Sequence, residues 1–132
     1  MQKKIGIIGL GYVGLPLAMA FSEKFQVIGF DIDKKRVNQL NLFEDKTDQA
    51  LREELEELLK INLTLTSDPN LIEDCQIYII TVPTPVTKEK TPDLSFLLSA
   101  SKTVGLCLKK GDLVIYESTV YPGCTEDDCV PV

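Results

Sequence analysis

The amino-acid sequence predicts an α/β fold in which a doubly wound parallel sheet carries helices on both faces. Three observations support this prediction. Short apolar runs typical of buried parallel strands alternate along the chain with longer segments of helical periodicity. Three glycines follow the first apolar run, and acidic residues end the second. Both endings are typical of strands whose carboxyl ends line a ligand site.

The N-terminal elements follow from these runs. Residues 5–8 form the first expected strand, and apolar residues at helical spacing predict a helix over 15–25. The second strand is expected over 26–33. Asp33 is expected to cap a short helix over 34–40, because a carboxylate at this position accepts the first free backbone amides.

The central part of the chain alternates in the same way. Leucines recur on one side of an amphipathic helix over 47–60, and a short strand is expected over 63–65. Asp68, followed by a proline, is expected to cap another short helix. The apolar run over 75–85 predicts a strand that two prolines end.

The C-terminal part adds one helix and one strand. Residues 91–93 open a helix that ends near 109–111, where lysines and a glycine favour a C-terminus. The last strand is expected over 112–119. Thr125 is expected to cap a further helix with an acidic first turn. We therefore expect residues 1–132 to form one domain, truncated after the fifth strand and incomplete at its C-terminus.

Composition excludes several classes of protein. The chain has 132 residues, a net charge of −6 and an apolar fraction of 44%. It lacks the basic surplus that nucleic-acid binders generally show. No apolar stretch reaches the roughly 18 residues that a membrane span requires. We expect a cytoplasmic protein that binds neither nucleic acid nor membranes.

The cysteines are predicted to be buried or incidental thiols. Four are scattered along a chain that contains no histidine: Cys75, Cys107, Cys124 and Cys129. Their spacing lacks the close pairs of zinc sites, and no basic residue stands next to them to activate a thiolate. We expect no metal site, and no disulfide framework in a cytosolic chain of this size.

The glycines form the pattern GxGxxG over residues 9–14, in which each has its own role. Gly9 permits a tight turn, Gly11 lets a pyrophosphate approach bare backbone, and Gly14 lets the following helix pack closely. The helix N-terminus offers unpaired amides and a partial positive charge to the phosphates. Tyr12 is a candidate core aromatic whose backbone amide faces the phosphates.

Asp31 supplies the acid that completes this pattern, about 20 residues after the glycines. Its carboxylate is expected to bind the adenosine ribose and to repel a ribose phosphate, which favours NAD over NADP. Lys34, Lys35 and Arg36 leave NADP open, because cations accommodate that phosphate. The alternative for the whole pattern is a tight strand–helix turn with an acid that only caps a helix.

Two further motifs end strands at the same edge of the sheet. The sequence VPTP, residues 82–85, ends the fourth strand, and Glu117, Ser118 and Thr119 end the fifth. Prolines after a strand often do no more than stop it. The arrival of several polar side chains, Thr84 among them, at one sheet edge favours a functional role.

These motifs resemble those of the nucleotide-sugar dehydrogenases, the UDP-glucose/GDP-mannose dehydrogenase family. The resemblance covers all 132 residues in order, and it is carried by GLGYVGLPLA, FDID followed by Arg36, VPTP and YESTVYPGCTEDDCVP. The last motif is most similar to the bacterial branch that oxidises UDP-N-acetylhexosamines for surface polysaccharides.

The resemblance implies a Rossmann-like fold, NAD as cofactor, and oxidation of a sugar's primary alcohol to a carboxylate in two hydride transfers. Thr119 is the implied auxiliary catalytic residue, which helps to position a water or the reacting oxygen. The implied cofactor contacts are Gly9, Gly11, Tyr12, Val13 and Gly14 at the pyrophosphate, Asp31 and Arg36 at the adenosine, Val82, Pro83, Thr84 and Pro85 along the cofactor, and Ser118 and Thr119 near the nicotinamide.

The resemblance also implies parts that lie beyond these residues. They are a nucleophilic cysteine in a glycine-rich motif, a catalytic lysine and asparagine, a sugar-binding domain and a central dimer helix. We therefore expect this chain to be the NAD-binding portion of a longer enzyme. That enzyme takes a UDP-sugar and forms a homodimer or higher homo-oligomer, while the 132 residues alone bind NAD weakly and are inactive.

Three other functions stay open. Another dehydrogenase with the same glycine motif, such as the 6-phosphogluconate or hydroxyacyl-CoA type, shares the first half of the pattern but not ESTVYPGCTE. A stand-alone module that senses NAD or NADH and controls a partner also fits the glycine turn. A scaffold that uses the fold without the cofactor is the third.

Overall fold

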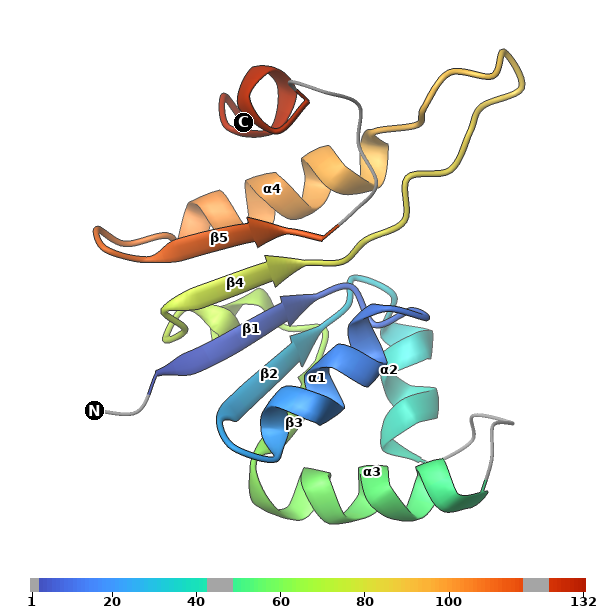
Figure 1. Ribbon diagram of the computed structural model, residues 1–132, viewed down its shortest axis with the longest axis vertical. Coiled ribbons are helices and arrows are strands. Elements are labelled where there is room, and N and C mark those ends of the chain that lie inside the picture. The colour runs from blue at the N-terminus through green and yellow to red at the C-terminus, as the bar shows by residue number, and fades with distance from the viewer. Residues whose placement is uncertain (1–2, 43–48, 118–123) are drawn as a thin grey trace.

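The computed structural model describes residues 3–42, 49–117 and 124–132. Its centre is a five-stranded parallel sheet in the order β3-β2-β1-β4-β5 (Figure 1). The chain starts in the middle of the sheet, moves to one edge and then to the other, which confirms the doubly wound prediction. The strands are β1 (Lys4–Ile8), β2 (Gln26–Phe30), β3 (Leu63–Thr66), β4 (Ile77–Ile80) and β5 (Leu113–Tyr116).

Two helices begin at the caps that the sequence predicts, Asp33 and Asp68. The Asp33 carboxylate accepts hydrogen bonds from the amides of Lys35 and Arg36 at 3.1 and 3.2 Å. Asp68 accepts one from the amide of Asn70 at 3.0 Å, and the helix that follows is a single 3₁₀ turn. The helices are α1 (Gly14–Ser22), α2 (Lys34–Asn41), α3 (Gln49–Ile61), η1 (Pro69–Ile72), α4 (Ser95–Cys107) and η2 (Thr125–Cys129).

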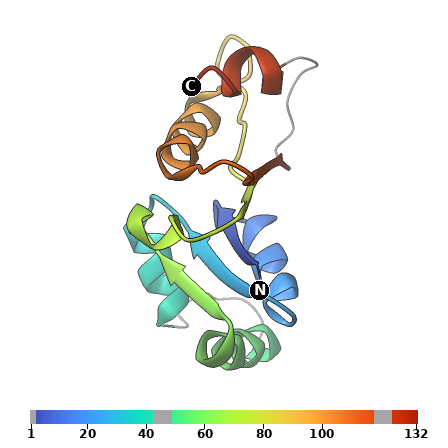
Figure 2. The same cartoon turned by 90° about the vertical axis from the view of Figure 1, so that its left-hand side faces the viewer.

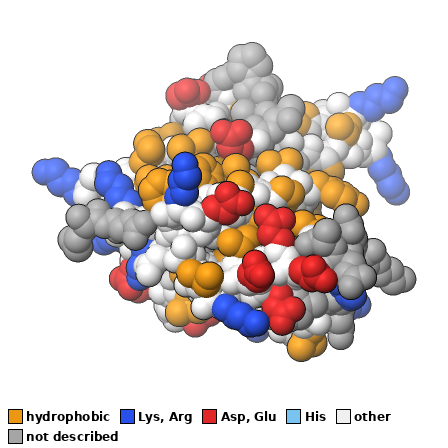
Figure 3. Space-filling view, turned by 60° about the horizontal axis from the view of Figure 1, so that its bottom comes forward, with side chains coloured by type: hydrophobic (Ala, Val, Ile, Leu, Met, Phe, Trp, Pro, Cys, Tyr) orange, Lys and Arg blue, Asp and Glu red, His pale blue; other side chains and the backbone are white. Residues whose placement is uncertain are grey.

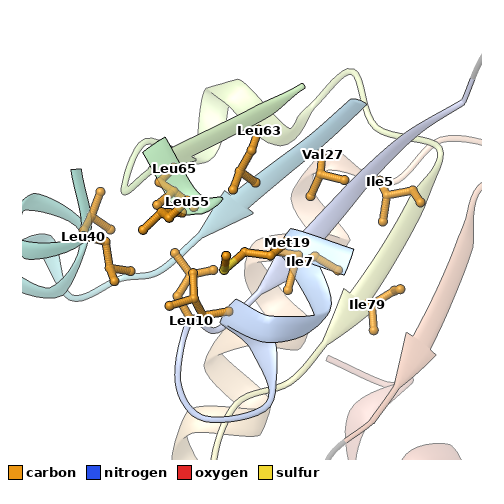
Figure 4. Close-up of a cluster of buried hydrophobic side chains, with 13 residues drawn as sticks. Ile5, Ile7, Leu10, Met19, Val27, Leu40, Leu55, Leu63, Leu65 and Ile79 are labelled. Carbon is orange, nitrogen blue, oxygen red and sulfur yellow. The ribbon is translucent and has the colours of Figure 1, made fainter. Parts of the chain in front are cut away.

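The sheet separates two hydrophobic clusters. Ile5 and Ile7 of β1 face the cluster formed with α1, α2 and α3, whereas Ile8 faces the cluster formed with η1, α4 and η2. Figure 4 shows Met19 of α1 in the first cluster, on the same side of the sheet as Leu55 of α3. Figure 2 shows α4 and η2 side by side at the other end of the molecule. Apolar residues on both faces are what a buried parallel strand requires.

Several element ends differ from the prediction. Thr125 does not cap η2: the cap position is Cys124, without a side-chain hydrogen bond, and the helix is one π-turn. Thr125 is the first residue of that turn, and its carbonyl accepts the amide of Val130 at 2.9 Å. The strand predicted over 75–85 is confined to β4, which ends before the prolines.

The outward face of α3 is charged. Figure 3, which turns this side of the molecule forward, shows acidic side chains gathered there. The exposed acids of α3 are Glu53, Glu54, Glu56 and Glu57. Glu56 lies 3.7 Å from Lys60, an exposed i,i+4 pair that contributes little to stability. Within the described ranges, no helix is long and apolar enough to cross a membrane.

Candidate functional site

The first half of the turn between β1 and α1 is held by hydrogen bonds to neighbouring segments. The amide of Gly9 donates to the carbonyl of Phe30 at 2.8 Å, and Gly9 has a φ of +106°. The amide of Leu10 donates to Asp31 Oδ2 at 2.9 Å, while Arg36 Nε donates to the Leu10 carbonyl at 3.1 Å. A positive φ is the conformation that glycine adopts without strain, which is the role predicted for Gly9.

Gly14 lies under this half of the turn, where there is no room for a side chain. A Cβ atom on Gly14 would lie 1.7 Å from the carbonyl oxygen of Gly9 and 2.5 Å from Oγ1 of Thr81. The predicted close packing is therefore present. The nearest neighbours are the turn itself and the end of β4.

The second half of the turn is open. A Cβ atom on Gly11 would meet nothing within 4 Å. The carbonyls of Gly11 and Val13 accept amides of α1 at 3.2 Å. Among the described residues, no acceptor contacts the amides of Gly11, Tyr12 and Val13. These are the orphan donors of a helix N-terminus, and they can bind an anion.

The prediction that Tyr12 is a core aromatic was wrong. The residue is 103% exposed, since Tyr12 stands at the tip of the turn, before α1 begins. Its predicted contribution through the backbone amide does not depend on the ring.

A cavity of about 310 Å³ lies beside the turn. This volume is within the range of about 300–1,000 Å³ that small-molecule sites occupy. Its walls come from the ends of β1, β2 and β4, from the start of α2 and from one face of α4. The lining residues are Ile8, Gly9, Leu10, Gly11, Phe30, Asp31, Ile32, Asp33, Arg36, Val82, Pro83, Phe96, Ser99, Ala100 and Thr103.

The Asp31 carboxylate is oriented by two backbone amides. Oδ2 accepts from Leu10 and Oδ1 accepts from Asp33, both at 2.9 Å. An ionised carboxylate has about four lone-pair sites, so about two remain for hydroxyl groups of a ligand. The carboxylate therefore keeps acceptor capacity toward the cavity that it lines.

The structure brings six of the thirteen predicted cofactor residues together at the cavity. Gly9, Gly11, Asp31, Arg36, Val82 and Pro83 all line the cavity. Tyr12 and Val13 line a second groove, on the α1 side, together with Glu117. Thr84 and Pro85 line neither, and the carbonyl of Pro85 accepts the amide of Asp93 at 2.7 Å. Ser118 and Thr119, including the predicted auxiliary catalytic residue, lie outside the described residues.

Sequence reasoning missed part of the cavity wall. Phe96, Ser99, Ala100 and Thr103 line it from α4. Their spacing of three and four residues marks one helix face, which was a usable signal. Thr81 was missed as well, although it directly precedes the VPTP motif.

The cysteines carry no sign of nucleophilic activation. All four are free, and Cys75, Cys124 and Cys129 are buried. Burial raises the pKa of the Cys75 thiol to about 11 and also raises the pKa values of Cys107 and Cys129. Reactive cysteines have lowered pKa values, so Cys75, Cys107 and Cys129 fit the prediction of buried or incidental thiols. Within the described ranges, no group of side chains could hold a metal ion.

Comparisons of sequence and of structure both find dehydrogenases that act on nucleotide sugars. The chain is 54% identical to UDP-N-acetyl-D-glucosamine 6-dehydrogenase from Salmonella typhi and 49% identical to the enzyme of that name from Pseudomonas aeruginosa, over 99% and 98% of its own length. It spans about 30% of the length of each of these curated relatives. The structure of UDP-D-ManNAc dehydrogenase from Pyrococcus horikoshii matches 93% of this chain and 30% of that one, with a TM-score of 0.87 and 35% identity.

A family model describes the same region. Residues 3–132 match the NAD binding domain of the UDP-glucose/GDP-mannose dehydrogenase family. The Rossmann-like fold and NAD as the cofactor, both predicted from the sequence, are thereby confirmed. The chain belongs to the UDP-glucose/GDP-mannose dehydrogenase family, as its NAD binding domain.

Proposed function

We propose that this chain holds NAD across the turn between β1 and α1, as the cofactor-binding portion of a UDP-N-acetylhexosamine 6-dehydrogenase. One observation carries the proposal. The amides of Gly11, Tyr12 and Val13 lack acceptors among the described residues, next to a cavity that contains the Asp31 carboxylate. A diphosphate needs the first feature and an adenosine ribose needs the second.

The residues of the cavity fit the adenosine half of NAD. Asp31 would accept the ribose hydroxyls with the lone pairs that Leu10 and Asp33 leave free. Apolar groups of Ile32, Val82 and Phe96 line the same space and suit the faces of a planar base. The side chains of Ile32 and Phe96 are 68% and 47% exposed, so both are available to a ligand.

The position of Asp31 favours NAD over NADP. A phosphate on the ribose would approach a carboxylate that two backbone amides hold in place. Arg36 lines the cavity and could offset part of this repulsion, although its Nε donates to the carbonyl of Leu10 at 3.1 Å. Lys34 and Lys35 are exposed and absent from the cavity lining. These placements support the preference for NAD.

The chemistry of the reaction is that of the cofactor. When bound, NAD would accept a hydride from the sugar carbon that carries the primary alcohol, and two such oxidations, with two NAD and one water that supplies the second oxygen, would give a carboxylate. The chain's own part is to hold the diphosphate with backbone amides and the ribose with Asp31. The substrate class is supported by the names of the Salmonella and Pseudomonas relatives. We infer a cytoplasmic, homo-oligomeric enzyme of surface polysaccharide synthesis, to which Thr119 contributes an auxiliary catalytic group.

Two measurements test this function. Calorimetry on the 132-residue chain should show weak binding of NAD at one site and weaker binding of NADP. The complete protein that carries this chain should reduce NAD with UDP-GlcNAc, UDP-GalNAc or UDP-ManNAc, and not with 6-phosphogluconate. The chain alone should show no turnover. Reduction with 6-phosphogluconate, or turnover of a UDP-sugar by these 132 residues, would contradict the proposal.

A further inference from the structure

We propose that Thr81 is a positioning residue of the cofactor site, because its hydroxyl and the Asp31 carboxylate hold opposite ends of one peptide group in the glycine turn. That peptide group joins Gly9 to Leu10. This inference rests on the function proposed above and adds a residue to it.

Thr81 lies directly after β4 and is 8% exposed. Its amide donates to the carbonyl of Ile8 at 2.8 Å. Its hydroxyl lies 2.8 Å from the carbonyl oxygen of Gly9 and 3.2 Å from that of Ile8. A threonine hydroxyl has one proton to donate, and the shorter distance gives Gly9 the principal bond.

The same peptide group is bound at its other end. The amide of Leu10 donates to Asp31 Oδ2 at 2.9 Å. The peptide group is planar and trans, so its carbonyl oxygen and amide hydrogen point in opposite directions. Thr81 therefore fixes the oxygen on the α1 side, while Asp31 fixes the hydrogen on the cavity side.

The position of Gly14 explains why the Gly9 carbonyl has a single orientation. A Cβ atom on Gly14 would lie 1.7 Å from the Gly9 oxygen and 2.5 Å from Thr81 Oγ1. The oxygen is thus enclosed by the hydroxyl of Thr81 and the bare Cα of Gly14. Without the hydroxyl, a buried carbonyl loses its partner, and such a group is unfavourable.

The orientation of this peptide group matters for an anionic ligand. If it turned over, the carbonyl oxygen would face Asp31 and the cavity, where it would repel both the carboxylate and a diphosphate. The Asp31 carboxylate would also lose one of its two orienting amides. Thr81 therefore acts on ribose recognition through the turn, without touching the ligand.

The test compares Thr81→Val, which keeps the volume and removes the hydroxyl, with Thr81→Ser, which keeps the hydroxyl. We expect Thr81→Val to raise the dissociation constant for NAD about tenfold and to reduce the preference for NAD over NADP. Thr81→Ser should stay within about twofold of the unmodified chain. In the absence of NAD, amide hydrogen exchange of Leu10 should be about tenfold faster in Thr81→Val.

A matched control removes a buried hydroxyl elsewhere. Ser101, 6% exposed, donates to the carbonyl of Leu97 at 2.8 Å, in α4. Ser101→Ala should lower stability but leave Leu10 exchange and the NAD/NADP ratio unchanged. If Thr81→Val does not fold, Thr81→Cys takes its place, because a thiol is a weaker hydrogen-bond donor than a hydroxyl. Thr81→Cys should bind NAD detectably, but more weakly than Thr81→Ser.

Three results would overturn the inference. Leu10 exchange and the NAD/NADP ratio could be the same in Thr81→Val as in the unmodified chain. Thr81→Ser could bind NAD as weakly as Thr81→Val, or Thr81→Cys could bind NAD as tightly as the unmodified chain. The unmodified chain could bind no NAD, which would contradict the proposed function itself and, with it, the role of Thr81.

Discussion

The two halves of the turn between β1 and α1 use their polar groups in opposite ways. In residues 8–10, the backbone groups are bonded within the protein, to Thr81, Phe30, Asp31 and Arg36. In residues 11–13, the amides have no acceptor among the described residues. The difference shows how a short turn can be rigid and still bind a ligand: one half sets the geometry, and the other half remains available.

The glycines of the motif follow the same division. Gly14 is required because protein atoms crowd it, with a carbonyl oxygen 1.7 Å from the position of a Cβ. Gly11 has nothing within 4 Å of that position. One pattern of three glycines therefore combines a packing constraint at Gly14 with an open space at Gly11. Substitutions at the two positions should have different effects on folding and on binding.

The largest expected effect is that of Gly14→Ala. The added methyl group cannot fit without moving the turn, so we expect a loss of about 3 kcal/mol in the free energy of unfolding, with loss of NAD binding. Chemical denaturation measures the first and calorimetry the second. Gly105→Ala is the control, because Gly105 is an exposed helical residue with open space around it. That variant should be stabilised by about 0.5–1 kcal/mol. Equal stability of the two variants would contradict the close contact between Gly14 and the Gly9 carbonyl.

Gly11→Val should affect binding far more than folding. Its φ lies outside the left-handed region and no atom crowds it, so we expect the free energy of unfolding to change by no more than about 0.5 kcal/mol. The side chain would fill the space in front of the free amides and raise the dissociation constant for NAD at least about tenfold, equivalent to about 1.4 kcal/mol. Unchanged affinity would contradict a diphosphate at this position and favour the scaffold function.

Asp31→Asn tests the link between the two halves. The amide oxygen of Asn can still accept from Leu10, but its NH₂ group cannot accept from the amide of Asp33. The charge that a ribose hydroxyl and a ribose phosphate would meet is removed as well. We expect NAD affinity to fall about fivefold and discrimination against NADP to fall by more. Asp68→Asn removes a carboxylate charge at a helix cap away from the cavity, and it should leave both affinities unchanged. Persistent rejection of NADP by Asp31→Asn would assign that role to another residue.

The smallest effect is expected for Tyr12→Ala. Tyr12 is 103% exposed, and the proposed contact is made by its backbone amide. The dissociation constant for NAD should change by less than about twofold. The free energy of unfolding should change by less than about 0.5 kcal/mol. A large loss of affinity would mean that the ring itself contacts the cofactor.

Local features of this molecule were predictable from the sequence, because short-range patterns determine them. The cap at Asp33 and the roles of Gly9 and Gly14 follow from residue types at fixed spacing. Thr81 could not be found in this way. Its contact with Gly9 depends on the pairing of β4 with β1, in which Ile80 lies opposite Ile8, and the two strands are about 70 residues apart in the sequence.

The errors have physical causes as well. Tyr12 was predicted in the core because aromatic residues are usually buried, but a residue at the tip of a turn points outward. Thr125 was predicted as a cap from its residue type, but the helix begins one residue earlier and closes as a π-turn. The wall that α4 contributes was missed because a helix face becomes a cavity wall only after the helix packs against the sheet.

A crystal structure of this chain with NAD bound would show whether the open amides of the turn hold the diphosphate. We predict diphosphate oxygens within hydrogen-bonding distance of the amides of Gly11, Tyr12 and Val13, and a ribose hydroxyl at the carboxylate of Asp31. The peptide group between Gly9 and Leu10 should keep the orientation that it has without the cofactor. NAD bound away from the turn, or a ribose with no contact to Asp31, would contradict the account.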